Sequence, residues 1–178
     1  MERIISYILL FLCISVNAQN VWQQDTVIAA NGKSPEQIIN CATQWAASSF
    51  AQFSPDISND ENSVNIILNI PFDIKNFSYA AGSGYLIGHI KIQAKDGRFK
   101  IEMYNFNHTS TSRSYAEWWS MGLILENTPE QWVDGAKWKQ KREVYKRIIE
   151  ALNKLKLSTF ISAAEYIPSC TPKEEEDW

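Results

Sequence analysis

The feature that most constrains the fold is a pair of long alternating stretches joined by the dipeptide Asp96-Gly97. One stretch runs from Tyr85 to Lys95 and the other from Arg98 to His108. Asp-Gly between such stretches is a strong β-hairpin signal, because both residues tolerate the positive φ of a two-residue turn. This turn fixes the register, so Lys95 pairs with Arg98 and every later pair follows.

This register sorts the side chains of the hairpin by their chemistry. One face receives three apolar pairs: Ile90 with Met103, Ile92 with Ile101, and Ala94 with Phe99. The other face receives a charge pair and an aromatic-rich group: Lys91 with Glu102, His89 with Tyr104, Ile87 with Phe106, and Tyr85 with His108. Because cross-strand neighbours contact each other, we expect the first face to enter the core.

The N-terminal half predicts two further strands and one helix. Residues 21–30 are expected to form a strand. Ser34-Pro35-Glu36-Gln37 is a capping box with proline at the first helical position, so a helix is expected from there to about Phe50. The inward residues of this helix, at helical spacing, are Ile38, Cys41, Ala42, Trp45 and Ser49. Residues 55–62 are expected to be a polar loop, residues 64–72 an alternating strand, and residues 75–84 another loop.

The C-terminal third predicts helices. Ser114-Tyr115-Ala116-Glu117 and Thr128-Pro129-Glu130-Gln131 both match the capping-box pattern. The first is expected to open a short helix, and the second a long helix that ends near Leu157. The inner stripe of the long helix is Trp138, Tyr145, Ile148, Leu152 and Leu155. Its other side is basic, with Lys137, Lys139, Lys141, Arg142, Lys146 and Arg147, which is typical of a solvated helix face. Residues 173–178 are an acidic tail that we expect to be disordered.

Strands therefore come first and helices last along most of the chain. This segregation favours the α+β class, with the helices packed on the apolar face of an antiparallel sheet. Residues 19–172 are expected to form one domain. The net charge of −3 argues against a general nucleic-acid binder.

The first 18 residues predict a signal peptide. Arg3 supplies a positive charge, Ile4 to Val16 is a short apolar run, and Ala18 completes a small-residue cleavage site. The run is shorter than the roughly 20 apolar residues that span a bilayer, so we expect no membrane span. The sequence predicts export to the periplasm or the exterior, with cleavage after Ala18.

Two cysteines remain after this cleavage, Cys41 and Cys170. In an exported protein such a pair can form a disulfide. Cys41, however, lies on the apolar side of the predicted helix, where a buried free cysteine is common. The free thiol is the interpretation favoured by the sequence, and the disulfide is the alternative.

Several of these features occur together in a known family. They are the signal peptide, the Ser34-Pro35-Glu36-Gln37 helix start with Trp45 inside the helix, and the Asp60-Glu61-Asn62 turn before an alternating strand. The most specific feature is the hairpin from Ile90 to Ile101, followed by Asn105-Phe106.

In these respects the chain resembles exported bacterial domains of unknown function that have a TATA-binding-protein-like (TBP-like) fold. The resemblance covers about residues 25–108 and leaves residues 114–165 as a helical extension. It implies a curved antiparallel sheet with helices on one side. It implies no activity and no DNA binding, since a fold does not carry a function.

The residue pattern contains no set of side chains typical of an active site, a cofactor site or a metal site. The two histidines, His89 and His108, are separated by several pairs of the hairpin, which is too far to share one metal ion. Asp73 and Glu117 are candidate carboxylates that nothing in the sequence pairs. A hydrolase whose site is assembled across loops is therefore the competing hypothesis rather than the leading one.

Two groups of side chains are candidates for binding. The first is the second face of the hairpin: Tyr85, Ile87, His89, Tyr104 and Phe106. An open face this aromatic is typical of a contact site, unless residues 114–135 fold over it. The second group is Trp118 and Trp119, with Trp132 and Trp138 nearby, which either stack on a sugar or belong to the core.

The sequence therefore favours a non-catalytic binding or interaction module of the cell envelope. Its partner would be an envelope protein or a small ligand, and a purely structural envelope partner is a further alternative. The identity of the partner and the oligomeric state stay open.

Overall fold

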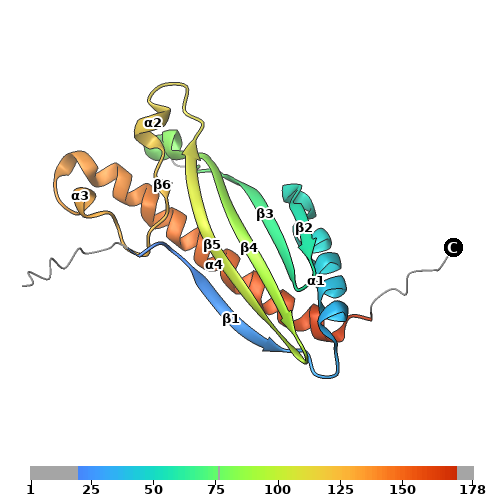
Figure 1. The fold of residues 1–178 in the computed structure, drawn as a ribbon. Helices are drawn as coiled ribbons and strands as arrows, with labels where there is room; N and C mark the ends of the chain where they lie inside the picture. Colours follow the sequence, from blue (N-terminus) through green and yellow to red (C-terminus); the bar gives the residue numbers. More distant parts are fainter. Residues whose placement is uncertain (1–19, 76, 172–178) are drawn as a thin grey trace, which may run out of the picture.

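The computed structural model describes residues 20–75 and 77–171. The predicted signal peptide and the acidic tail both lie outside these residues. The described chain forms one antiparallel sheet whose helices are on one side (Figure 1). The predicted α+β class and the curved antiparallel sheet are confirmed.

The sheet has the strand order β1-β5-β4-β3-β2, and β6 pairs with β5 beyond the end of β1. Its strands are β1 (Gln24–Ala29), β2 (Asp56–Asp60), β3 (Ser63–Phe72), β4 (Gly84–Lys95), β5 (Arg98–Ser110) and β6 (Gly122–Leu123). The α-helices are α1 (Pro35–Ser49), α2 (Ala116–Trp119), α3 (Glu130–Val133) and α4 (Lys139–Ser169). Three short 3₁₀ helices are η1 (Ala51–Phe53), η2 (Phe77–Gly82) and η3 (Ala136–Trp138).

Helices α1 and α4 pack against each other and against the same face of the sheet. The predicted capping box starts α1: Gln37 N–H donates to Ser34 Oγ at 3.3 Å, and Ser34 N–H donates to Gln37 Oε1 at 3.0 Å. Trp45 is fully buried between the two helices and the sheet, and its Nε1 donates to Ser162 Oγ of α4 at 3.2 Å. The core therefore lies between the sheet and this pair of helices.

The hairpin register is as predicted from the turn up to the pair of His89 with Tyr104. The apolar pairs of this stretch are buried, with Ile90, Ile92 and Ile101 fully enclosed. Beyond His89 the register shifts by one residue, because Asn105 and Phe106 of β5 together stand opposite Gly88 of β4.

This β-bulge overturns two predicted pairs. Ile87 pairs with Asn107 rather than Phe106, and Tyr85 pairs with Thr109 rather than His108. Asn105 adopts a φ of 54°, the left-handed conformation that asparagine tolerates better than most residues. The extra residue turns Phe106 and His108 onto the core face, where both are fully buried. Phe106 is therefore not part of the second sheet face, and its prediction as a contact residue is wrong.

The predicted polar loop at residues 55–62 contains an edge strand instead. β2 pairs with β3 from Asp56–Ile67 to Asp60–Ser63. Most of its side chains are exposed, and only Ile57 packs against the core. An exposed edge strand needs no alternation of apolar residues, which explains why the pattern indicated a loop.

The C-terminal helices also depart from their predicted boundaries. The residue before α2 is Tyr115, at a φ of 67°, and no side chain caps this helix, so the predicted capping box at Ser114 is wrong. The helix expected after Thr128 is interrupted at Gly135, whose φ is 93°, and is divided into α3, η3 and α4. Helix α4 then runs twelve residues beyond Leu157, because its buried stripe continues through Thr159, Ala163 and Ile167, of which only the last is large and apolar.

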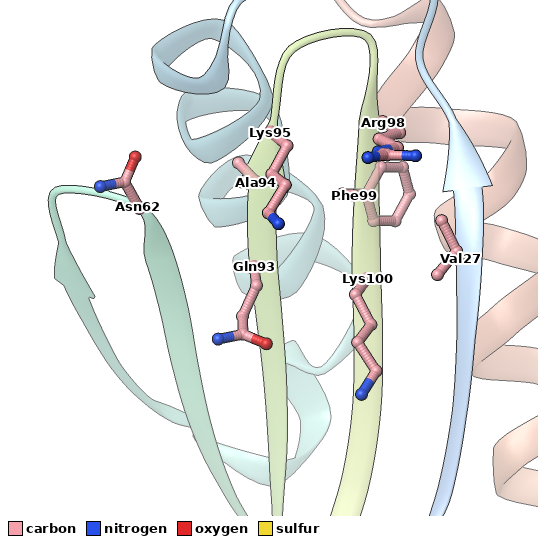
Figure 2. Close-up of a pocket in the computed structure, with 8 residues that line it drawn as sticks. All are labelled: Val27, Asn62, Gln93, Ala94, Lys95, Arg98, Phe99 and Lys100. Carbon is pink, nitrogen blue, oxygen red and sulfur yellow. The ribbon is translucent and has the colours of Figure 1, made fainter.

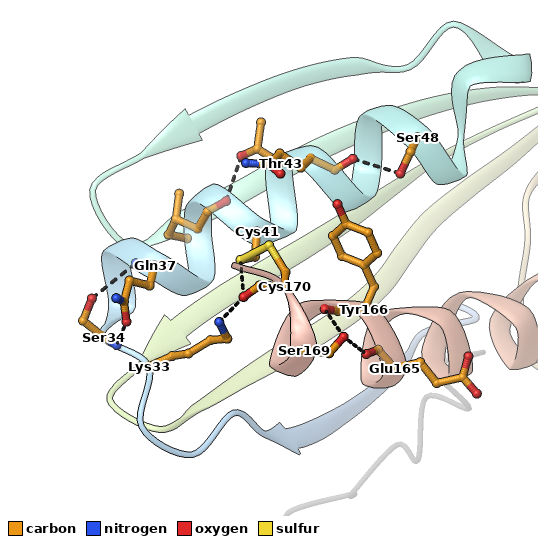
Figure 3. Close-up of a disulfide and its surroundings, with 12 residues drawn as sticks. Lys33, Ser34, Gln37, Cys41, Thr43, Ser48, Glu165, Tyr166, Ser169 and Cys170 are labelled. Carbon is orange, nitrogen blue, oxygen red and sulfur yellow. Dashed lines mark hydrogen bonds between the residues drawn. A yellow bond between two sulfur atoms is a disulfide. The ribbon is translucent and has the colours of Figure 1, made fainter. Parts of the chain in front are cut away.

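A disulfide joins Cys41 of α1 to Cys170 at the end of α4 (Figure 3), with 5.9 Å between the two Cα atoms. The favoured interpretation of Cys41 as a free thiol is therefore wrong, and the alternative is correct. The predicted end of the long helix near Leu157 gave no reason to place Cys170 beside α1. The disulfide fixes the end of α4 next to the beginning of α1.

Candidate binding surface

The sheet face opposite the two long helices is open. Large apolar side chains on this face remain 39–60% exposed: Val27, Ile67, Tyr85, Ile87 and Leu123. Residues 114–135 do not fold over it, since β6 instead extends the sheet edge beside β5. The predicted second face of the hairpin is thus accessible to solvent.

Six side chains of the open face lie on neighbouring strands and form a group that we term the aromatic patch: Ile67, Tyr85, Ile87, His89, Tyr104 and Leu123. The register aligns Ile67, His89 and Tyr104 in one row across β3, β4 and β5. His89 and Tyr104 stack, with ring centroids 5.4 Å apart and an interplanar angle of 26°. A second row runs from Ile87 through Asn107 to Leu123.

Four of the five predicted contact residues are therefore brought together, namely Tyr85, Ile87, His89 and Tyr104. Two members of the aromatic patch were missed. Ile67 is apolar at a position where the alternation of its strand expects a polar residue, as at Asn65 and Asn69. This departure is the signal that would have placed an apolar side chain on the open face. Leu123 belongs to a two-residue strand, which has no periodicity to detect.

The turn end of the same face is basic. A hollow of about 580 Å³, which we term the basic hollow, lies there (Figure 2). Its polar lining residues are Asn62, Gln93, Lys95, Arg98 and Lys100, and Val27 adds an apolar side. Sequence reasoning missed it because Val27 and Asn62 come from segments distant from the hairpin.

The cations of the basic hollow differ in their partners. Lys100 lies between Glu102 and Asp25, 3.1 Å from the latter, and its hydrogen bonds to these carboxylates raise the pKa of its ammonium group. In the part of the chain that the structure describes, Lys95 and Arg98 form no ion pair. The basic hollow therefore has two cations whose charge is not matched by a direct partner.

The tryptophans of the C-terminal segment surround a lysine. The Lys141 ammonium nitrogen lies 4.8 Å from the ring centroids of both Trp118 and Trp132, and 5.7 Å from that of Trp138. Lys141 is only 7% exposed, and burial lowers its pKa. The prediction that Lys141 belongs to a solvated basic face is wrong.

Cation–π contacts of this kind contribute about 0.5–2 kcal/mol each. They hold residues 118–138 against α4, and the ring faces of Trp118 and Trp132 are in contact with the chain's own ammonium group. Trp119, the other residue of the second candidate group, is partly buried and forms a T-shaped pair with Trp118, with ring centroids 4.6 Å apart. The aromatic patch is therefore the stronger candidate for binding an external partner.

His108, the second histidine, is fully buried, and its ring bonds to backbone groups of neighbouring segments. Met121 N–H donates to its Nδ1 at 3.2 Å, so the neutral ring carries its proton on Nε2, which donates to Gly82 O at 3.0 Å. Burial lowers the pKa of His108 to about 4. Both ring nitrogens are thus satisfied in the neutral form, and protonation of His108 opposes the folded state.

The two candidate carboxylates are not assembled into a site with His108. Asp73 accepts a hydrogen bond from Ser83 Oγ at 3.2 Å. The same hydroxyl accepts from Ile74 N–H at 2.9 Å, so Ser83 links both residues at the end of β3 to the start of β4. Glu117 is exposed on α2.

Among residues 20–75 and 77–171, no group of three His, Cys, Asp or Glu side chains is arranged to hold a metal ion. Within the same residues, no helix combines the length and the hydropathy needed to span a bilayer.

Comparison with known proteins identifies the fold. No protein-family model matches the chain, and no curated protein matches it. A crystal structure of a TBP-like protein from Parabacteroides distasonis is similar to it, with a TM-score of 0.52, 13% identity, and coverage of 81% of this chain and 93% of that chain. A crystal structure of a DUF4468 family protein from Bacteroides ovatus has a TM-score of 0.49 and 13% identity, and the match covers 87% of this chain and 90% of that chain.

The first of these matches extends beyond residues 25–108, where the sequence resemblance lies, because it covers 81% of the 178 residues. The similarity in fold therefore includes part of the C-terminal segment. At 13% identity the match describes the arrangement of the backbone and says nothing of what the chain binds. The resemblance noted in the sequence is thus confirmed: this chain has the TBP-like α+β fold.

Proposed function

We propose that the chain is an exported, non-catalytic interaction module that binds its partner through the aromatic patch. The observation that carries this proposal is the set of large apolar side chains left 39–42% exposed on one end of one sheet face: Ile67, Tyr85, Ile87 and Leu123. Contiguous exposed apolar surface of this kind marks interaction sites in soluble proteins, whereas single exposed residues do not. The stacked pair of His89 and Tyr104 adds aromatic area to this surface.

The shape of the patch supports a binding role. Its members lie on four adjacent strands of a continuous sheet, so their backbone positions are fixed before a partner arrives. A preorganised surface loses little conformational entropy on binding. The buried titratable side chains, by contrast, are engaged in holding the fold: His108 contacts Gly82 and Met121, and the Tyr145 hydroxyl bonds to both backbone groups of Leu125.

Two independent features support the exported location. The first is the signal-peptide pattern that ends at Ala18. The second is the disulfide between Cys41 and Cys170, since disulfides persist in oxidising compartments and are rare in the cytosol. The intact mass of protein recovered from cells that express the full sequence tests this part: a chain that starts at Gln19 is expected, and a chain that retains residues 1–18 would contradict export.

The binding part is tested with a melting-temperature screen against glycans, lipids, peptidoglycan fragments and peptides. A ligand present at about 100 times its Kd stabilises a protein by about 2.7 kcal/mol. We expect any shift to disappear in Ile67→Ser and Tyr104→Ala, which alter the aromatic patch. The shift should persist in the matched control Leu157→Ser, because Leu157 is 61% exposed on α4 at the other side of the molecule. A shift that survives both patch variants would place the site elsewhere.

A further inference from the structure

The basic hollow lies at the turn end of the open face, beyond the aromatic patch along β4 and β5. Of the three cations that line it, Lys100 is matched by Asp25 and Glu102. Lys95 and Arg98 flank the turn and, within residues 20–75 and 77–171, have no ion pair. Two unmatched cations beside one concave surface favour a negatively charged occupant.

The C-terminal end of the described chain lies next to this turn. Cys170 is fixed to α1 by its disulfide, and its carbonyl oxygen accepts a hydrogen bond from Lys33 Nζ (Figure 3). The carbonyl oxygen of the same lysine accepts from Gly97 N–H at 3.0 Å. Gly97 is the turn residue immediately before Arg98. A single residue, Lys33, therefore connects the end of α4 with the tip of the hairpin.

The sequence that follows Cys170 carries the complementary charge. Glu174, Glu175, Glu176 and Asp177 are four consecutive carboxylates, preceded by Lys173. Residues 172–177 extend by at most about 22 Å, at roughly 3.3–3.6 Å for each residue. The run starts close to the tip of the hairpin, because Lys33 contacts both Cys170 and Gly97.

We propose that the basic hollow is the docking site for the acidic run Glu174-Glu175-Glu176-Asp177 of the same chain. The carboxylates pair with Lys95 and Arg98, which lack other partners. Docked there, the run covers the basic end of the open face and leaves the aromatic patch free. An anionic partner would then have to displace the chain's own carboxylates, whereas an apolar partner of the aromatic patch would not.

Zero-length carbodiimide crosslinking tests this contact, because it joins a carboxylate to a lysine only when the two touch. The full sequence is expressed, the purified protein is crosslinked, and the crosslinked peptides of the monomer are mapped by mass spectrometry. We expect crosslinks from residues 174–177 to Lys95, and fewer to Lys154, an exposed lysine on α4. High salt should reduce the yield at Lys95, since exposed charges are screened.

The sharpest variant is Arg98→Gln, which keeps the reactive amine of Lys95 and removes the neighbouring cation. Arg98 is exposed, so the melting temperature of this variant is expected to stay unchanged. The yield at Lys95 should fall to the level of Lys154 in Arg98→Gln and in Glu175→Gln/Glu176→Gln. A higher crosslink yield at Lys154 than at Lys95 would overturn the proposal, as would a yield at Lys95 that neither variant lowers. Crosslinks to Lys95 found in a crosslinked dimer and not in the monomer would overturn it as well. None of these outcomes affects the test of the aromatic patch, which uses different residues.

Discussion

Replacing Phe106 by alanine is expected to lower the free energy of unfolding by about 3–5 kcal/mol, the range for truncating a buried aromatic side chain. The bulge places Phe106 in the core, fully buried, where its ring meets Trp22 edge-on at 5.3 Å. Tyr104→Ala, two residues earlier, is the matched control. Tyr104 is half-buried on the open face, so its truncation is expected to cost about 1 kcal/mol or less. Denaturant unfolding of the two variants measures both values.

The same contact predicts a second effect at Gly88. A Cβ atom added to Gly88 would lie 2.3 Å from two ring carbons of Phe106, which is far inside van der Waals contact. Gly88→Ala is therefore expected to destabilise the wild-type protein and to cost much less in the Phe106→Ala background, since the clashing ring is then absent. Equal costs for Phe106→Ala and Tyr104→Ala, or additive costs for Gly88→Ala and Phe106→Ala, would show that Phe106 does not lie over Gly88.

Loss of the disulfide is expected to lower the free energy of unfolding by about 2–4 kcal/mol. The bond joins residues 129 positions apart, so it removes considerable freedom from the unfolded chain. For a domain of this size each kcal/mol shifts Tm by about 2–4 °C, so Cys170→Ser should melt several degrees below the wild type. Cys170 is the better position to change because it is partly exposed, whereas Cys41 is fully buried.

Reduction provides the control for this prediction. A thiol reductant should lower the Tm of the wild type to about that of Cys170→Ser, and should leave the Tm of Cys41→Ala/Cys170→Ser unchanged. A wild-type protein whose Tm is insensitive to the reductant, with free thiols found by titration before its addition, would contradict the bond between Cys41 and Cys170.

The sequence predicted the part of the fold that local chemistry determines. The Asp96-Gly97 turn determines the hairpin register up to His89 and Tyr104, and the capping box determines where α1 begins. The register was lost at the bulge, because an asparagine such as Asn105 tolerates a left-handed conformation without requiring it. Gly88 was the available hint, since a glycine inside a strand often stands opposite a bulge or a close neighbour.

Features that depend on long-range packing could not be predicted in the same way. The end of α4 depends on Thr159 and Ala163, which are buried by contact with other elements although neither is strongly apolar. The disulfide depends on that helix end, which brings Cys170 beside α1. Without it, the sequence favoured a free thiol at Cys41. Lys141 shows the same limit, because only the folded chain brings three tryptophans around its ammonium group.

The candidate surface was predicted in outline. Period-two alternation correctly placed Tyr85, Ile87, His89 and Tyr104 on one face, and misplaced Phe106 because of the bulge. That face is open only if residues 114–135 do not pack over it. Within this segment, β6 pairs with β5 and extends the sheet instead. The basic hollow needs Val27 and Asn62 from segments distant in sequence, so no pattern within the hairpin could reveal it.

The proposed function rests on the aromatic patch being the surface that a partner contacts, and site-specific photocrosslinking in intact cells tests this most directly. A photoreactive phenylalanine derivative is placed at Tyr85 or Ile87 of the full chain, and at Leu157 or Tyr115 as exposed controls. We predict covalent adducts of one defined mass at Tyr85 and Ile87 that are absent at Leu157 and Tyr115. Adducts that form equally at all four positions, or only at the controls, would contradict the aromatic patch as the binding surface.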